Sequence, residues 1–425
     1  MKKVQRYIAV AGAGLGWQMM FMVTYACSSF YVAFQDSTGY SNTQIGLLLS
    51  LYGIMQLIMY IPGGWLADRV NTKTLLVIGW MGTSLTGFGI AVLPSFSIMI
   101  ALYLLNAVFA CGFVFNANQK MTRLLGTNEE QGKLVTFRQI VRNVSTIPIS
   151  AMGIWLIASI SSVRLSMQIV LISFSALNLL GALLILFFFK PEIKDTAKEN
   201  PVTFSDVKNV LKIRNVWLIG VICFSIYLAS TSLIYMQPYM VEFFGLDAAQ
   251  STTLGVIYKN IGIIAAPFCT FLGNRNRDKV SITKVISIAC FISAICFICY
   301  IIFPTVPELL TLTIVVFLLA SFWVVGVWGI MFIPVSEIEL PVRLTGTAMG
   351  VVSIITYITD AFYYSLCGGW IDQYGAGGYF NIFLLTCICL IIAFIAGLFV
   401  AKDIKKIRAK NDTDVQDEGE VQVQL

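Results

Sequence analysis

Three ionisable side chains stand inside long apolar stretches of this 425-residue sequence. Lys259 lies about halfway along its stretch, between Tyr258 and Asn260, and Asp360 and Arg142 lie within two others. A charged group in hydrocarbon costs several kcal/mol, so such residues are rare and usually serve a function. We therefore take these three residues as candidates for binding or moving charge.

Lys259 and Arg142 indicate an anionic ligand. Two cations without a permanent acid beside them make a site for a carboxylate or a phosphate. The alternative is that protein groups satisfy both cations: Asp360 would pair with Lys259, and helix carbonyls or a neighbouring polar side chain would bind Arg142. The sequence leaves both interpretations open.

Asp360 is the candidate for proton coupling. The chain has no histidine, the residue that most often titrates near neutral pH. Burial and a nearby lysine act in opposite directions on the ionisation of a carboxylate. Asp360 could therefore exchange a proton during transport, or form a static ion pair with Lys259.

The elements that carry these residues are apolar helices long enough to cross a membrane. Hydrophobic residues make up 58% of the chain and charged residues 12%, against about 25% charged residues in a soluble domain. Spans are predicted at residues 7–34, 44–66, 74–93, 96–119, 134–158, 167–189, 216–243, 250–273, 282–303, 308–334, 347–371 and 379–401. We therefore predict an all-α membrane protein with twelve transmembrane helices and the lipid bilayer as its surroundings.

A polar segment divides the spans into two sets of six. The predicted organisation is a six-helix bundle at 1–189, a cytoplasmic linker at 190–215, a second six-helix bundle at 216–401, and a disordered tail at 402–425. Two six-helix halves are typical of transporters built from parallel repeats, with the substrate site between the halves near the middle of the membrane.

The basic residues indicate the orientation. With the N-terminus in the cytoplasm, the inner loops would hold Lys2, Lys3, Arg6, Arg69, Lys73, Lys120, Arg123, Lys133, Arg275, Arg277, Lys279, Lys284, Arg343 and the basic residues of the linker and tail, and the outer loops only Arg164. This asymmetry predicts that both termini are cytoplasmic.

The same composition excludes several other classes of protein. The net charge of +6 is scattered over short loops, so no nucleic-acid surface is expected. The ten cysteines lie within apolar runs and the chain lacks histidine, so we expect no metal site and no cofactor. No catalytic residues are predicted.

A short motif between the second and third spans identifies a family. The stretch runs Pro62-Gly63-Gly64-Trp65-Leu66-Ala67-Asp68-Arg69-Val70-Asn71-Thr72-Lys73. It resembles the G-x-L-a-D-R-x-G-x-x-K/R loop of the major facilitator superfamily, with matches at Gly64, Leu66, Asp68, Arg69 and Lys73. Asn71 replaces the usual glycine, a mild departure because asparagine tolerates a left-handed backbone.

The resemblance implies a gate and a substrate cavity. In that family the acid of this loop braces the start of the eleventh helix, which here gives Asp68 a gating role with Arg343 beside it. The fifth and eighth helices meet, which would bring Arg142 and Lys259 towards one path. The central helices offer Gln18, Tyr25, Asn106, Asn116, Tyr227, Tyr235, Gln237, Trp323 and Trp328. Helix packing is the alternative role for each of these polar and aromatic residues.

A second stretch is similar to one branch of the superfamily. Residues 337–360 resemble the tenth-to-eleventh helix region of bacterial sugar-phosphate and organic-anion permeases. We therefore expect a bacterial inner-membrane secondary transporter that takes up a small organic anion, such as a sugar acid or sugar phosphate, with protons and as a monomer. Uptake of a neutral sugar or nucleoside, efflux of drugs or metabolites, and a non-transporting receptor or scaffold are the alternatives.

Overall fold

Every regular element in the described part of the chain is a helix. The computed structural model describes residues 3–125, 128–190, 204–274 and 281–423. The first half contains α1 (Lys3–Thr24), α2 (Ala26–Ser29), α3 (Tyr31–Thr38), α4 (Asn42–Arg69), α5 (Thr72–Ala91), α6 (Phe96–Ala107), the π-helix η1 (Val108–Phe115), α7 (Asn116–Leu124), α8 (Asn128–Ser159) and α9 (Val163–Phe188). The second half contains α10 (Phe204–Val210), α11 (Arg214–Ser232), η2 (Leu233–Tyr235), α12 (Met236–Phe244), α13 (Ala248–Asn260), α14 (Gly262–Asn274), α15 (Ile282–Ile302), η3 (Pro307–Leu309), α16 (Leu310–Trp328), α17 (Pro334–Glu337), α18 (Val342–Tyr374) and α19 (Ala376–Val423).

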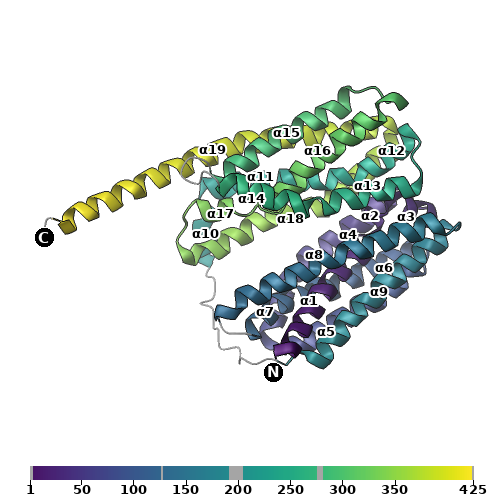
Figure 1. Cartoon of the computed structure of the whole chain (residues 1–425), viewed down its shortest axis with the longest axis horizontal. Helices are drawn as coiled ribbons and strands as arrows, with labels where there is room; N and C mark the ends of the chain where they lie inside the picture. Colours follow the sequence, from purple (N-terminus) through teal and green to yellow (C-terminus); the bar gives the residue numbers. More distant parts are fainter. Residues whose placement is uncertain (1–2, 126–127, 191–203, 275–280, 424–425) are drawn as a thin grey trace. The chain divides into compact units, whose positions relative to one another are not determined.

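The described residues form twelve helical stretches long and apolar enough to cross a membrane. They correspond one for one to the twelve spans predicted from the sequence, so the all-α membrane fold is confirmed. The succession of these helices along the chain can be followed by colour in Figure 1.

The first and eighth spans are interrupted where the sequence predicted continuous helices. The first span stops at Thr24, and Tyr25 and Phe30 leave the helical conformation on either side of the single turn α2. The eighth span is divided at Ile261 into α13 and α14. Breaks of this kind expose backbone groups inside the membrane, where they need partners from neighbouring helices.

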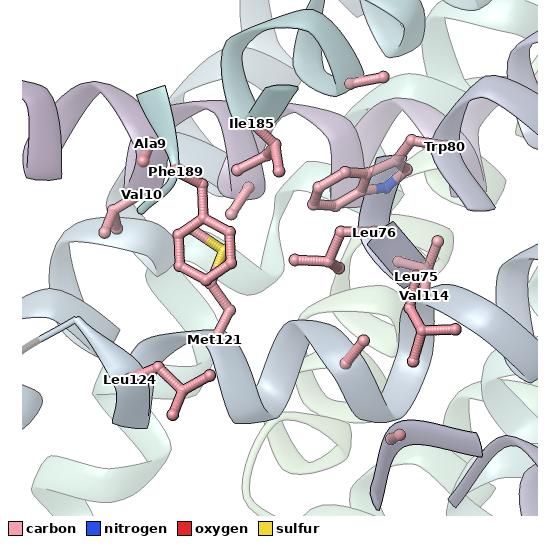
Figure 2. Packing of buried hydrophobic residues seen from close by; sticks show 14 of the residues in the cluster. Ala9, Val10, Leu75, Leu76, Trp80, Val114, Met121, Leu124, Ile185 and Phe189 are labelled. Carbon is pink, nitrogen blue, oxygen red and sulfur yellow. The ribbon is translucent and has the colours of Figure 1, made fainter. Parts of the chain in front are cut away.

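The helices of the first half enclose a continuous apolar core. Leu76 and Trp80 of α5 face Ile185 of α9, and Val114 and Met121 approach from η1 and α7 (Figure 2). These side chains are fully or almost fully buried. Lipid tails are as apolar as these side chains, so close dispersion contacts stabilise this packing inside the bilayer.

The compact units of the fold differ from the predicted halves. One unit comprises the described residues of Met1–Glu199 with Ile234–Asn260 and Asp360–Tyr379. The other comprises those of Asn200–Leu233, Ile261–Thr359 and Phe380–Leu425. Parts of the seventh, eighth, eleventh and twelfth spans therefore group with the first six, because α12, α13 and the end of α18 pack directly against helices of the first half.

A seam of close backbone contact joins α4 to α18 within the first unit. A side chain at Gly46 would collide with the carbonyl oxygen of Tyr364, and one at Gly368 would collide with that of Asn42. A Cβ atom at Gly53 would lie 2.5 Å from Cβ of Asp360. On α18, positions 360, 364, 368 and 372 recur every four residues and therefore share one face of the helix.

The last helix runs on into the tail. α19 extends from Ala376 to Val423 and forms one long helix in Figure 1, and the disorder expected after Lys402 stays a prediction. No proline occurs in this segment and glycine only at 419, so nothing in the residues before that position breaks a helix.

Candidate substrate site and gate

The break in the first span is built by two serines. The hydroxyls of Ser28 and Ser29 donate to the carbonyl oxygen of Tyr25 at 2.9 and 3.0 Å. Serine hydroxyls that bond backbone carbonyls three or four residues earlier compete with the helix ladder and bend it. The break therefore places two hydroxyl oxygens at one point, with their hydrogens already engaged.

Lys259 contacts this serine pair. Its Nζ donates to Ser28 Oγ at 2.8 Å and to Ser29 Oγ at 2.7 Å. Because both hydroxyl hydrogens point to the Tyr25 carbonyl, the hydroxyl oxygens are free to act as acceptors. Neutral dipoles thus hold the ammonium, and the described hydrogen bonds of Lys259 go to these serines and not to the carboxylate of Asp360.

Gln237 of α12 completes the junction. Its Nε2 donates to the carbonyl of Ser28 at 2.8 Å, and its Oε1 accepts from the Tyr31 amide at 3.4 Å. One side-chain amide therefore satisfies a carbonyl and an N–H beside the helix break. Gly255 of α13 leaves space for it, since a Cβ atom there would lie 2.6 Å from Cδ of Gln237.

Arg142 is brought together with another predicted site residue. Its Nε donates to Oε1 of Gln18 on α1 at 3.2 Å. One turn earlier on α8, the buried Arg138 donates to the Asn118 carbonyl at 2.7 Å and to Gln119 Oε1 at 2.9 Å. Since α13 packs against α8 in the same unit, Lys259 and Arg142 lie on adjacent helices.

Asp360 is 1% exposed and lies on the seam between α4 and α18. Its Cβ packs against the backbone of α4 at Gly53, where a larger residue would not fit. This placement puts a carboxyl group in the contact between two spans.

Several other predicted site residues have structural partners. Tyr235 is 1% exposed, and its hydroxyl donates to the Tyr364 carbonyl of α18 at 3.0 Å. Asn116 Nδ2 donates to the Tyr60 carbonyl at 3.4 Å, and Asn260 Nδ2 donates to Val256 within its own helix at 2.9 Å. These bonds fit the helix-packing alternative that the sequence left open.

The remaining cavity candidates are scattered. Tyr25 is half-buried with its ring edge-on to Tyr52, the centroids 5.9 Å apart. Tyr258 is 2% exposed, so it is covered by protein. Asn106 is fully buried and hydrogen-bonded to Thr24 and Thr86 inside the first bundle. Trp328 ends α16 in the other unit.

The predicted gate is described in part. The side chains of Asp68 and Arg343 lie outside the described residues. The guanidinium of Arg69 stacks over Trp65, with 4.1 Å from Cζ to the ring centroid. Lys120 Nζ donates to the Ala67 carbonyl at 2.9 Å, a favourable contact for a cation at the end of α4. A Cβ atom at Gly64 would meet only Asn116, at 3.8 Å, so no close approach requires this glycine.

Asn71 stands where the family usually has glycine, but a left-handed backbone is not the reason that it fits. Its φ is −55°, so the backbone is not left-handed. Its side chain instead caps α5, with Oδ1 accepting from the Lys73 amide at 2.9 Å.

Asp372, near the end of α18, makes polar contacts that the sequence did not indicate. Its carboxylate accepts hydrogen bonds from Asn42 and Thr43 at the start of α4. Ser28 and Ser29 were also missed, because a serine pair in an apolar run has no distinctive spacing. Only the partners brought by folding identify them.

The fold and these polar contacts inside spans define a polytopic helical membrane protein of the transporter class. Residues 8–363 match the sequence pattern described as Major Facilitator Superfamily, and the chain belongs to this family. Members are secondary transporters that work by alternating access, with the two halves moving around a central site.

Individual relatives agree with this assignment. The chain is 24% identical to the inner membrane protein YqcE of Escherichia coli over 404 residues, covering 93% of this chain and 95% of that protein. A bacterial homologue of the human lysosomal transporter Spinster has the same fold, with a TM-score of 0.76 at 14% identity, covering 96% of this chain and 99% of that one. The nucleoside transporter NupG superposes with a TM-score of 0.70 at 16% identity, covering 94% and 99%.

Proposed function

We propose that this transporter carries a small hydrophilic organic anion, such as a sugar acid or sugar phosphate, and that Lys259 is its principal charged contact. The observation that carries the proposal is the pair of hydrogen bonds from the ammonium to Ser28 and Ser29. Hydroxyl dipoles orient a cation without neutralising it, so the positive charge remains available to an anion.

The contacts of Lys259 leave one of its donors for a ligand. An ammonium has three N–H groups, and the two serines take two of them. Arg142 on the neighbouring helix would supply a second cationic contact, with Gln18 holding its Nε. A guanidinium also matches the planar geometry of carboxylate and phosphate groups.

We further propose that uptake is coupled to protons through Asp360. The carboxyl group is buried in the seam between α4 and α18. A negative charge there is costly, so protonation would favour one arrangement of the two helices over another. The bacterial inner membrane is the proposed location, as for the relative from Escherichia coli.

A ligand-stabilisation screen tests the substrate class. Purified protein in detergent would be melted with sugar acids, sugar phosphates, neutral sugars, nucleosides and cationic drugs. One anion class should raise the melting temperature of the wild type and of Lys284→Gln, an exposed-lysine control, but not of Lys259→Gln. A neutral sugar, nucleoside or drug that stabilises Lys259→Gln as well as the wild type would contradict the anion proposal and select the uptake or efflux alternative.

A further inference from the structure

We propose that Asp372 is a gating residue, whose carboxylate latches the end of the eleventh span to the start of the second and must release when that end of the transporter opens. The inference depends on alternating access, which the family defines, and not on the identity of the substrate. It concerns the end of α4 remote from Asp68.

Three hydrogen bonds make the latch. Asp372 Oδ1 accepts from the Asn42 amide at 3.1 Å and from Asn42 Nδ2 at 2.8 Å, and Oδ2 accepts from the Thr43 amide at 2.7 Å. The first amides of a helix have no partner within it and carry a partial positive charge. A carboxylate from another span is therefore well matched to this position.

The second span does not need Asp372 to begin its helix. Ser41 is the N-cap of α4, and its hydroxyl accepts from the Gln44 amide at 3.2 Å. The Gln44 side chain in turn accepts from the Ser41 amide at 3.0 Å, which completes a capping box. The bonds to Asp372 are thus additional to a complete local cap, which suits a contact that forms and breaks.

Other residues orient the groups that bind Asp372. Tyr31 donates to Asn42 Oδ1 at 2.8 Å, and Gln35 donates to the same oxygen at 3.2 Å. These two bonds from α3 turn the Nδ2 group of Asn42 towards the carboxylate. Gly368, one turn before Asp372, allows α18 to approach the Asn42 backbone closely.

The exposure of Asp372 makes release possible. The carboxylate lies at the surface, so water can solvate it when the helices separate. A buried ion would instead lose its partners in a medium that solvates charge poorly. The contact can therefore favour the closed seam without preventing it from opening.

The latch and the predicted Asp68 gate lie at opposite ends of the same helix. From Asn42 to Asp68 is 26 helical steps, or roughly 39 Å at 1.5 Å per residue. In alternating access the two ends open in turn. Asp372 would therefore hold its end shut while the Asp68 end is open.

The test uses a reporter cysteine inside the seam. Ser50 is 2% exposed, its Oγ accepts from the Ser365 amide at 3.1 Å, and it lies roughly 12 Å along α4 from Asn42. The alkylation rate of Ser50→Cys by a membrane-impermeant maleimide would be measured in full-length protein in membranes. The rate of the same chain without the reporter would be subtracted.

Asp372→Asn should raise the alkylation rate about tenfold, the effect of losing charge-assisted hydrogen bonds of modest net strength. Asp372→Glu should restore part of the protection. Asp36→Asn, which removes an exposed acid on α3, is the matched control and should leave the rate unchanged.

Asn42→Ala gives a second, milder disruption because both backbone amides remain. It should raise the rate in the same direction, with a melting temperature close to that of the reporter chain. A wild-type alkylation rate in both Asp372→Asn and Asn42→Ala would overturn the proposal. So would an equal increase in Asp36→Asn.

Discussion

At the scale of single residues, the role of Lys259 depends on which groups its ammonium contacts. An ion pair with Asp360 would have neutralised the lysine, whereas Ser28 and Ser29 only orient it. The serines can serve as acceptors because their hydrogens are bound to the carbonyl of Tyr25.

Asp360→Asn tests proton coupling at the same scale. The amide keeps the shape of the side chain but does not titrate, so uptake driven by a pH gradient should fall to near background. Exchange of labelled for unlabelled substrate across the membrane should persist, because exchange needs no net proton movement. Both rates would be measured in proteoliposomes.

Glu308→Gln, an exposed carboxylate at η3, serves as the control and should retain both activities. Uphill uptake by Asp360→Asn at the wild-type rate would show that Asp360 is not the coupling group. Its position on the seam would then reflect packing alone.

At the scale of elements, the seam between α4 and α18 depends on glycine at Gly46. A valine there would collide with backbone atoms of α18 at Tyr364, and a helix backbone cannot move aside as a side chain can. Overpacking of this kind costs about 1–3 kcal/mol. We expect Gly46→Val to lower the melting temperature of the purified protein and to raise the alkylation rate of a cysteine at position 50.

Gly350→Val is the matched control for this prediction. Gly350 also lies in α18, but an added side chain would have nothing within 4 Å. Equal melting temperatures for the two valine variants would argue against a closed seam at Gly46.

The breaks in the first and eighth spans are a second feature at the scale of elements, because their backbone groups need polar partners. Gln237 satisfies the Ser28 carbonyl and the Tyr31 amide beside the first break. The second break follows Lys259 by two residues. Two interrupted helices thus meet through polar side chains, which permits irregular backbone in a protein surrounded by lipid.

At the scale of the whole molecule, the orientation predicted from basic residues has a direct test. Green fluorescent protein fused after residue 425 should fluoresce in bacterial cells, and alkaline phosphatase fused there should be inactive. The reason is that both termini are expected in the cytoplasm, because loops rich in lysine and arginine tend to stay on the cytoplasmic side of the membrane.

Alkaline phosphatase inserted in the loop just before α9, at residues 160–162, should give the opposite result. That loop joins α8 to α9, and Arg164, the basic residue assigned to the outer side, follows it in the first turn of α9. An active fusion after residue 425 together with an inactive one at this loop would reverse the topology.

Much of the fold could be predicted because hydrocarbon imposes a simple rule. A helix that crosses the bilayer needs a long apolar run, so the twelve spans are visible in composition alone. The family was predicted from the loop at residues 64–73, where several residue types recur at fixed spacing. Both signals are local in the chain and need no tertiary information.

The site was only partly predictable. Lys259, Arg142 and Asp360 stood out because charge is rare in apolar runs. The pairing of Arg142 with Gln18 joins residues 124 positions apart, and that of Lys259 with Ser28 joins residues 231 apart. Common residue types at such separations carry no pattern along the sequence.

The sequence by itself determined the membrane class, the number of spans, the family and the residues whose charge demands a partner. Only the tertiary structure decided which partners they received, such as serine hydroxyls for Lys259 and the Gln18 amide oxygen for Arg142, and it alone revealed the bonds of Asp372 to helix amides. Hydrophobic burial follows from composition, whereas hydrogen bonds are directional and short. Their partners are therefore fixed only when packing brings particular atoms within about 3 Å of one another.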